Sequence, residues 1–172
     1  MQRLNKSFFE RPTLEVSKDL LGKILKVGKC SGRINEVEAY IGQNDPACHA
    51  ARGKTERNKI MFGPAGHLYV YFTYGMYHCA NIVTEADGFP AAVLIRSIEP
   101  LEGKELMKKR RGKKDNLCDG PGKLCIALGM TKESHNGLKA EVFDDNFAPG
   151  KIKSSPRIGI KVGIDKKWRF FY

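Results

Sequence analysis

Alternating apolar and polar positions predict that much of this chain is β-strand. In Ile158–Ile164 the apolar residues fall on every second position, which is the pattern of a half-buried strand. Gly75 separates two aromatic-rich segments and permits a tight turn, so these segments are predicted to form a hairpin. The predicted strands are Lys23–Val27, Arg33–Ile41, Leu68–Tyr74, Met76–Val83, Ala91–Ile98, Ile158–Ile164 and Trp168–Tyr172.

Three helices are predicted where capping and terminating residues border apolar segments. Thr13 is placed to cap the first helix, and Gly22, Gly112 and Gly129 follow the three helix ends. Hairpin-linked strands with helices at the sides favour an α+β fold around a mainly antiparallel sheet. No repeat, linker or compositional break divides residues 1–172, so we expect a single domain. The predicted helices are Leu14–Leu21, Pro100–Arg111 and Pro121–Leu128.

The charge balance of the chain indicates a polyanionic partner. Its formal net charge is +11, from 30 Lys and Arg against 19 Asp and Glu. Nucleic acid is the commonest polyanion inside cells. The densest basic stretch, Lys104–Lys114, contains a single acidic residue, Glu105. Taken alone, this stretch fits a DNA contact and a solvated helix end equally well.

Composition excludes several other classes of protein. Hydrophobic residues make up 41% and charged residues 28%, which is typical of a globular chain. Apolar runs such as Ala91–Ile95 are far shorter than the ~20 residues that cross a bilayer. Met1–Arg11 is polar and lacks the apolar stretch of a secretory signal, so an intracellular protein with no membrane contact is expected.

The five cysteines do not form a metal-binding pattern. They are scattered, with no C-x-x-C and no paired Cys/His spacing of a zinc site. The H-x-E and P-C-x-x-C pattern of cytidine deaminases is absent as well. We therefore interpret the cysteines as reduced thiols, mostly packed inside the fold, and expect neither a metal nor another cofactor.

The predicted strand Arg33–Ile41 carries two carboxylates on one face. With a period of two, Glu36, Glu38 and Tyr40 share that face, and apolar residues occupy the other. A solvent-facing strand surface is the commoner explanation for such a pattern. However, Arg96 is the only charge inside the apolar strand Ala91–Ile98, and a buried guanidinium needs an anionic or carbonyl partner. Pairing with Arg96 would keep Glu36 or Glu38 ionised, as a general base requires.

The turn of the predicted hairpin places Tyr74 and Met76 at its tip. Apolar bulk is out of place on such a tip, and proteins push aromatic and Met wedges of this kind between DNA base steps. The alternative, in which Tyr74 folds back over the sheet, is equally compatible with the residues alone. The net charge of +11 favours the DNA interpretation.

Two weaker features could contribute to a site. Gly120-Pro121-Gly122-Lys123 opens a helix, and free backbone N–H groups, the helix dipole and Lys123 together could clamp a phosphate. Many helices begin in this way. His49 lies in a loop eleven residues beyond Glu38, where a lone histidine is usually a surface residue.

Six motifs along the chain give it a resemblance to a known protein family. It resembles the mammalian-type alkyladenine DNA glycosylases, also called 3-methyladenine DNA glycosylases, from about Leu4 to Leu128 and again at Pro156–Gly163 and Trp168–Tyr172. The motifs are N-E-V-E-A-Y (35–40), H-A-A-R-G (49–53), R-N-K-I-M-F (57–62), L-Y-V-Y-F-T-Y-G-M-Y-H-C-A-N (68–81), V-L-I-R-S-I-E-P-L-E-G (93–103) and G-P-G-K-L-C-I-A-L (120–128).

The resemblance implies a monofunctional enzyme with a curved sheet and a protruding, DNA-intercalating hairpin. Such an enzyme flips alkylated or deaminated purines from duplex DNA and hydrolyses the N-glycosidic bond without a cofactor, and we expect a monomer. Glu38 would activate the attacking water, and Arg96 and the backbone carbonyl of Ile158 would help to hold it. Tyr40, His49 and Tyr71 would enclose the flipped base, and the His49 backbone N–H would read its edge. Asn81 would obstruct the amino group of normal guanine, and Tyr74 would fill the gap that the flipped base leaves in the stack. The residues expected to contact the DNA are Met76, Thr55, Met61 and Lys123.

Two departures and two alternatives accompany this resemblance. The chain stops at Tyr172, earlier than family members do, and residues 129–155 are unlike the family pattern. An architectural DNA binder would explain the charge but not Arg96 beside paired carboxylates. A carbohydrate hydrolase could use Glu36 and Glu38, although these side chains do not flank a sugar and the positive charge suits neutral glycans poorly.

Overall fold

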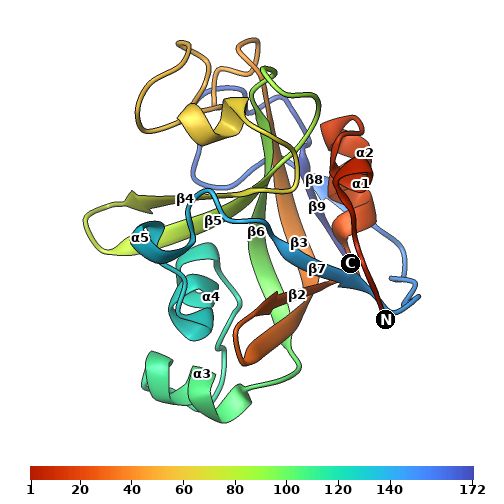
Figure 1. The fold of residues 1–172 in the computed structure, drawn as a ribbon, viewed down its shortest axis with the longest axis vertical. Helices are drawn as coiled ribbons and strands as arrows, with labels where there is room; N and C mark the ends of the chain where they lie inside the picture. The colour runs from red at the N-terminus through yellow and green to blue at the C-terminus, as the bar shows by residue number, and fades with distance from the viewer.

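The centre of the molecule is a pair of long antiparallel strands, β3 (Cys30–Ile41) and β6 (Ala91–Pro100). The structure, a computed structural model, describes residues 1–172. Figure 1 shows β3 and β6 upright in the middle, with the hairpin of β4 (Leu68–Thr73) and β5 (Tyr77–Val83) projecting to one side. The predicted α+β class and mainly antiparallel sheet are therefore confirmed.

All nine strands belong to one sheet. Seven of them follow the order β1-β7-β2-β3-β6-β5-β4, and β9, which also pairs with β8, joins at β3. One edge of β3 is shared between two partners: its beginning pairs with β2, and residues Glu36–Glu38 pair with β9. The pairing of β3 with β6 shifts its register on both sides of Glu36. The remaining strands are β1 (Gln2–Arg3), β2 (Ile24–Val27), β7 (Glu141–Asp144), β8 (Lys153–Ser155) and β9 (Arg169–Phe171).

The two faces of the central strands have different roles because side chains alternate along a strand. On β6, Val93 and Ile95 point into the main hydrophobic core, whereas Leu94 and Arg96 line a pocket on the other face. The same alternation holds on the hairpin, where Val70 lies in the core and Tyr69 and Tyr71 line the pocket. Because side chains alternate along these strands, one face of the sheet packs into the hydrophobic core and the other lines the pocket.

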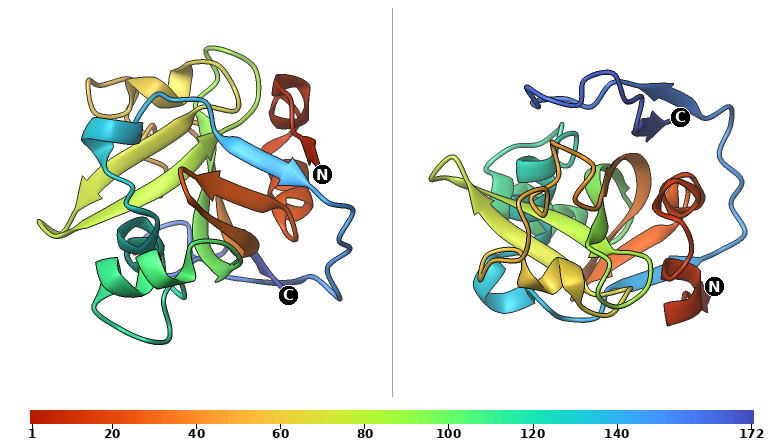
Figure 2. Two further views of the ribbon diagram at one scale, coloured as in Figure 1. Left: turned by 60° about the horizontal axis from the view of Figure 1, so that its bottom comes forward. Right: turned by 90° about the horizontal axis from the view of Figure 1, so that it is seen from above.

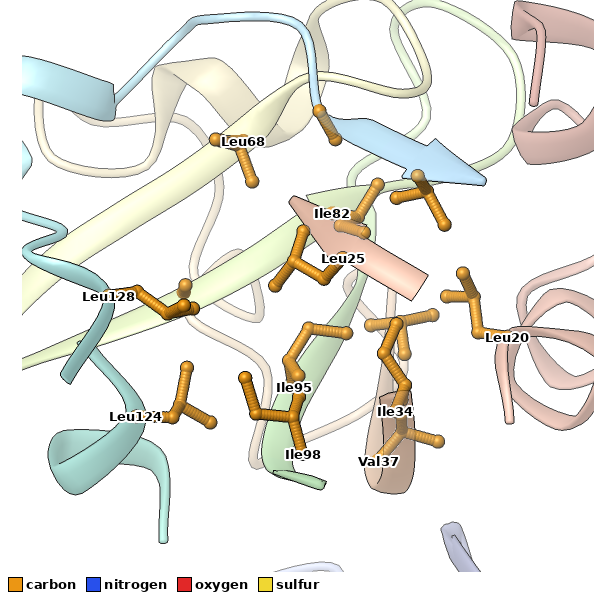
Figure 3. Packing of buried hydrophobic residues seen from close by; sticks show 14 of the residues in the cluster. Leu20, Leu25, Ile34, Val37, Leu68, Ile82, Ile95, Ile98, Leu124 and Leu128 are labelled. Atoms are coloured by element: carbon orange, nitrogen blue, oxygen red, sulfur yellow. The ribbon is translucent and has the colours of Figure 1, made fainter. Parts of the chain in front are cut away.

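Three helices close the core face of the sheet. Leu20 of α2 (Thr13–Leu20) and Leu124 and Leu128 of α4 (Pro121–Leu128) meet Ile34, Val37, Ile82 and Ile95 from the sheet (Figure 3). Met107 of α3 (Lys104–Arg111) joins the same cluster. None of the helices has the length and apolar character that a membrane crossing requires. The short helices are α1 (Lys6–Phe9), the 3-10 helix η1 (Lys59–Phe62) and α5 (Lys132–His135).

The predicted helices and all but one of the predicted strands agree with the structure, except at several boundaries. Thr13 does not cap α2: Pro12 is the N-cap, and the Thr13 hydroxyl is buried and donates to Glu85 Oε1 at 2.6 Å. Helix α3 begins at Lys104 rather than Pro100, because β6 continues through Pro100, which pairs with Gly32. All five cysteines are free and buried, which confirms the interpretation as packed thiols.

The predicted strand Ile158–Ile164 is wrong, because this segment is a loop between β8 and β9. Gly159 and Gly163 adopt φ angles of +77° and +66°, which a strand does not contain. Ile158, Val162 and Ile164 are each at least half exposed. The C-terminal part of the chain, coloured blue to violet, passes along one side of the molecule (Figure 2, right). Its loop between β8 and β9 contributes pocket residues without regular pairing.

Candidate active site

A pocket of about 380 Å³ lies on the polar face of the central strands. Such a volume falls within the usual range of small-molecule sites. Strands β3 to β6 provide half of the lining residues. The other half comes from the loop after Asp45, the 3-10 helix η1, the hairpin turn, the start of α4 and the loop after β8. The residues that line it are Tyr40, Ala47, His49, Met61, Tyr69, Tyr71, Thr73, Tyr74, Cys79, Asn81, Leu94, Arg96, Pro121, Ile158, Gly159 and Ile160.

Aromatic rings gather at one side of this pocket. The rings of His49 and Tyr71 meet edge to face with centroids 4.5 Å apart, and His49 Nδ1 lies 2.9 Å from the Tyr69 hydroxyl. Burial raises the pKa of Tyr71 and raises that of Tyr69 to about 12, so both phenols stay protonated at neutral pH. Loss of solvation, with the nearby Arg57 cation, lowers the pKa of His49. A neutral imidazole and neutral phenols can stack on a flat ligand.

Glu38 lies directly behind the pocket wall. Its side chain is fully buried, and three groups bind its carboxylate. The Tyr40 hydroxyl donates to Oε2 at 2.8 Å, the Ile158 amide donates to Oε1 at 2.7 Å, and Arg96 Nη1 lies 3.2 Å from Oε1. All three partners line the pocket themselves. The pairing of Arg96 with this strand, predicted from its isolated charge, is confirmed.

The second carboxylate, Glu36, is held by two arginines. Arg96 Nε and Arg169 Nε both donate to Glu36 Oε1, at 2.8 Å and 2.6 Å. Burial alone would raise the pKa of Glu36, but the hydrogen bonds from Arg169 and Arg96 outweigh it and lower the pKa. Glu36 does not line the pocket, and it contacts the site through Arg96. Sequence analysis missed Arg169, because it lies in a short terminal strand with no visible pattern.

The hairpin tip carries exposed apolar side chains in a strained turn. Tyr74 is 80% exposed and Met76 61% exposed. Tyr74 has a φ of +52°, a conformation that residues other than glycine adopt at a cost and that is often found at functional sites. Gly75 follows at +66°, as the tight turn requires. Tyr74 stands at the rim of the pocket and does not fold back into the core.

Asn81 is one of few buried polar residues in the pocket wall. It is 4% exposed, and its Nδ2 donates to the Tyr69 carbonyl at 3.0 Å. This bond fixes the side chain between β4 and β5. Asn81 therefore presents a polar group to the pocket from a rigid position.

The expected DNA-contacting residues lie in different environments. Thr55 is an exposed loop residue that exchanges hydrogen bonds with Asn58. Lys123 is exposed on the first turn of α4, and its Nζ is 3.0 Å from Asp119. Met61 is only 2% exposed and lines the pocket, so its contact with DNA stays a prediction.

A buried ion pair beside the pocket was also missed by sequence analysis. Arg157 and Asp45 form two short contacts of 2.6 Å and 2.8 Å, and both side chains are fully buried. The sequence shows Asp45 only as a loop residue before His49, and Arg157 only as the approach to a predicted strand. Neither residue has a periodic pattern around it that could have indicated burial.

No metal centre is indicated by the arrangement of these side chains. The protein has no group of three or more His, Cys, Asp or Glu side chains placed to hold a metal ion. The two carboxylates nearest the pocket are bound by arginines and by backbone and phenol donors. The chemistry available to these residues is that of a carboxylate, cations and aromatic rings around a pocket.

Comparison with known proteins identifies close relatives along the whole chain. A family model described as methylpurine-DNA glycosylase matches residues 7–172. A protein of Sodalis glossinidius, named as a candidate 3-methyladenine DNA glycosylase, is 53% identical over 97% of this chain and 95% of its own length. Proteins with the same name from Wolbachia pipientis wMel and Methanocella arvoryzae are 52% and 49% identical, over 97% and 99% of this chain and 89% and 92% of their own lengths.

Proposed function

The chain belongs to the methylpurine-DNA glycosylase family, and we propose that it flips the damaged purine out of duplex DNA and hydrolyses its glycosidic bond with a water activated by Glu38. Members of this family are hydrolases of N-glycosyl bonds that act on methylated purines, 3-methyladenine among them. DNA is accordingly the substrate. The single observation that carries the proposal is a fully buried Glu38 whose three binding partners all line an aromatic pocket.

In our proposal the damaged base leaves the duplex and enters the pocket. A stacked base hides its glycosidic bond, and extrusion costs a few kcal/mol, less for a damaged base. In our proposal Tyr40, His49 and Tyr71 enclose the extruded purine, and stacking on such rings recovers roughly 1–3 kcal/mol per base. The backbone N–H of His49 reads the base edge. Asn81, fixed by its bond to Tyr69, obstructs the amino group of normal guanine.

The proposed chemistry has one water and one base. Alkylation at N3 or N7 makes the purine cationic and thus a good leaving group, whereas a neutral lesion such as hypoxanthine leaves as an anion and must take up a proton in addition. The water oxygen bonds to C1′ while the C1′–N bond breaks, the bonding electrons neutralise the purine, and Glu38 takes the proton. The carboxylate also stabilises the oxocarbenium-like sugar that develops. Arg96 and the Ile158 carbonyl are proposed to hold the water beside Glu38.

Access to Glu38 restricts this mechanism. The carboxylate has no exposed surface, so a water reaches it only if one of its three partners moves. Arg96 and Tyr40 extend from paired strands, whereas Ile158 belongs to a loop and is 50% exposed. Transient movement of this loop is therefore the step that we expect to admit the water, and the loop then closes on Glu38 again before the glycosidic bond breaks.

Replacement of Glu38 by glutamine is the experiment that tests the proposal. A duplex with one hypoxanthine or ethenoadenine is incubated with excess enzyme, and hot alkali then cleaves the abasic sites. Glu38→Gln keeps the size and can still accept from Arg96, but an amide cannot take the proton of water. Since general-base catalysis contributes ~10²–10⁴-fold, excision should fall by about that factor while lesion-containing DNA still binds.

Glu36→Gln is the matched control on the same face of the same strand. Its amide oxygen can still accept from Arg96 and Arg169, so most of the activity should remain. A folded Glu38→Gln enzyme that binds the lesion and releases the base at near-normal rate would contradict the mechanism. If Glu36→Gln is instead the inactive variant, the strand is right and the carboxylate is wrong.

A further inference from the structure

The buried ion pair of Arg157 and Asp45 makes more contacts than charge neutralisation needs. Arg157 Nη1 donates to Asp45 Oδ2 at 2.6 Å and to the Ala39 carbonyl at 2.8 Å, and Nη2 donates to Asp45 Oδ1 at 2.8 Å. Burial would lower the pKa of Arg157, but the hydrogen bonds and charge of Asp45 outweigh it and raise the pKa, so the guanidinium stays charged. Buried ion pairs often contribute no more stability than apolar residues of similar size, so stability alone explains this one poorly.

The contacts of the pair join separate walls of the pocket. The Asp45 carboxylate also accepts from the amides of Ile41 and Ala47, each at 3.2 Å, which fixes the end of β3 and the loop that carries His49. The Arg157 guanidinium lies 4.6 Å from the centroid of the Tyr40 ring. Tyr40 in turn donates to Glu38.

The pair also sets the position of the loop that covers Glu38. Ile158 directly follows Arg157, and its amide donates to Glu38 Oε1 at 2.7 Å. The guanidinium also lies 5.2 Å from the centroid of the Trp168 ring, where the same loop returns to the sheet. The loop has no helix or strand of its own between β8 and β9. Arg157 thus holds both ends of a segment that otherwise lacks regular hydrogen bonding.

We propose that the Arg157–Asp45 pair positions the Ile158 loop (residues 156–168, between β8 and β9) and Tyr40 against Glu38 for the excision step. Arg157 is a positioning residue here, since it does not line the pocket. The inference rests on the proposed role of Glu38. A guanidinium is required because a planar fork can bind both Asp45 oxygens and a carbonyl while it also contacts two rings, which an ammonium cannot do. Displacement of a reacting group by about 1 Å can reduce a rate 10²-fold.

Arg157→Lys is the first test variant, because it keeps the buried cation but loses the fork. Asp45→Asn is the second, because it keeps one acceptor oxygen. Arg33→Lys is the matched control: Arg33 binds both oxygens of Asp145 at 2.7 Å and 3.0 Å, the Gly22 carbonyl at 2.7 Å and the face of Phe147, all away from the pocket. Arg33→Lys should therefore report the effect of the same exchange in a two-pronged ion pair outside the pocket, although its side chains are 12% and 31% exposed rather than fully buried.

Single-turnover excision at saturating enzyme separates positioning from folding. Partial unfolding lowers the fraction of active enzyme, which appears as a lower amplitude of the first turnover when the lesion duplex is in excess, and it leaves the rate constant of the folded molecules at saturating enzyme unchanged. We expect Arg157→Lys and Asp45→Asn to excise at full amplitude with rate constants about 10- to 100-fold lower, and to bind the lesion duplex as the unaltered enzyme does. Arg33→Lys should keep the rate constant. Trp168 is the only tryptophan, so acrylamide quenching of its fluorescence should increase in Arg157→Lys as the loop loosens.

Two outcomes would overturn the inference. The first is a folded Arg157→Lys enzyme with an unchanged rate constant. The second is a loss of amplitude or of folding in both test variants, because the pair would then act only on the stability of the chain. Glu38→Gln is measured in the same series, so that failure of the positioning role can be distinguished from failure of the proposed function. If Glu38→Gln is inactive and Arg157→Lys is normal, only the positioning role fails; if Glu38→Gln is fully active, the proposed function fails.

Discussion

Glu36 and Glu38 stand two residues apart on one strand, but their surroundings give them different properties. Glu38 is fully buried and bound by three groups that line the pocket. Glu36 is 20% exposed, and two arginine side chains share one of its oxygens. Identical side chains on one face of β3 can therefore serve as a base and as a support for Arg96. The sequence indicates the shared face but not this difference in depth.

At the scale of single residues, the pocket predicts that no covalent intermediate forms. Strand-cutting glycosylases attack with an amine and form a Schiff base, and no lysine lines this pocket. Borohydride added during turnover should therefore trap no protein–DNA adduct, and the product should be an intact abasic site. A glycosylase that cuts strands serves as the positive control. An adduct at stoichiometric yield would exclude attack by water.

The sequence predicts a contact when the residue type itself requires a partner, and it does not predict contacts that only the folded chain brings together. The position of Arg96 beside the carboxylates followed from a single charge in an apolar strand, because a buried guanidinium needs a partner. Asp45, Arg157 and Arg169 lie in loops or a short strand, where no period predicts burial. Arg157 and Arg169 are 112 and 133 residues away from their carboxylate partners in the chain, so nothing local indicated these pairs.

At the scale of elements, the hairpin of β4 and β5 combines a strained tip with a wall of the pocket. Its side chains alternate between the core and the pocket, and its tip exposes Tyr74 and Met76. Two successive positive φ angles, at Tyr74 and Gly75, turn the chain so that Tyr74 stands at the pocket rim. A side chain in that place can enter the gap that an extruded base leaves in the stack.

Tyr74→Ala should impair base extrusion more than the chemical step. It removes the ring that fills the stack and leaves Glu38 in place. We expect weaker binding and slower excision on a well-paired lesion, with a smaller loss where the lesion is already unpaired. Tyr74→Phe keeps the ring and should behave as the unaltered enzyme. If Tyr74→Ala matches the unaltered enzyme on the well-paired lesion, the tip does not enter DNA.

The one strand that was predicted wrongly shows the limit of periodicity. The alternation of Ile158, Ile160, Val162 and Ile164 suggested a half-buried strand. In the structure Ile158 and Ile160 line the pocket, Val162 and Ile164 are largely exposed, and two glycines with positive φ bend the segment. The edge of β3 beside it is already occupied by β9. An alternating pattern shows that successive side chains face different surroundings. A strand forms only if a neighbouring strand also has an unpaired edge with which the segment can form hydrogen bonds.

At the scale of the whole molecule, the net charge of +11 is spread over surfaces with different relations to the pocket. Helix α3 carries the densest basic stretch, but none of its residues lines the pocket. Part of its charge is already engaged, since Lys108 binds Glu105 and Arg110 donates to the Ala127 carbonyl. The Ile158 loop is less basic but forms the pocket rim, and Lys161 and Lys167 are exposed on it.

Binding to undamaged duplex should weaken steeply with salt, and the two surfaces should contribute unequally. Each lysine–phosphate pairing contributes about 0.9 to the slope of log K against log salt. If DNA lies across the pocket mouth, the double variant Lys161→Gln/Lys167→Gln should reduce the slope by about 2. Lys109→Gln/Lys113→Gln removes the same charge from the α3 region and should reduce the slope less, because no residue of α3 lines the pocket. Equal reductions would mean that α3 contacts DNA as closely as the loop does, and a larger effect at α3 would place the duplex on the helix side.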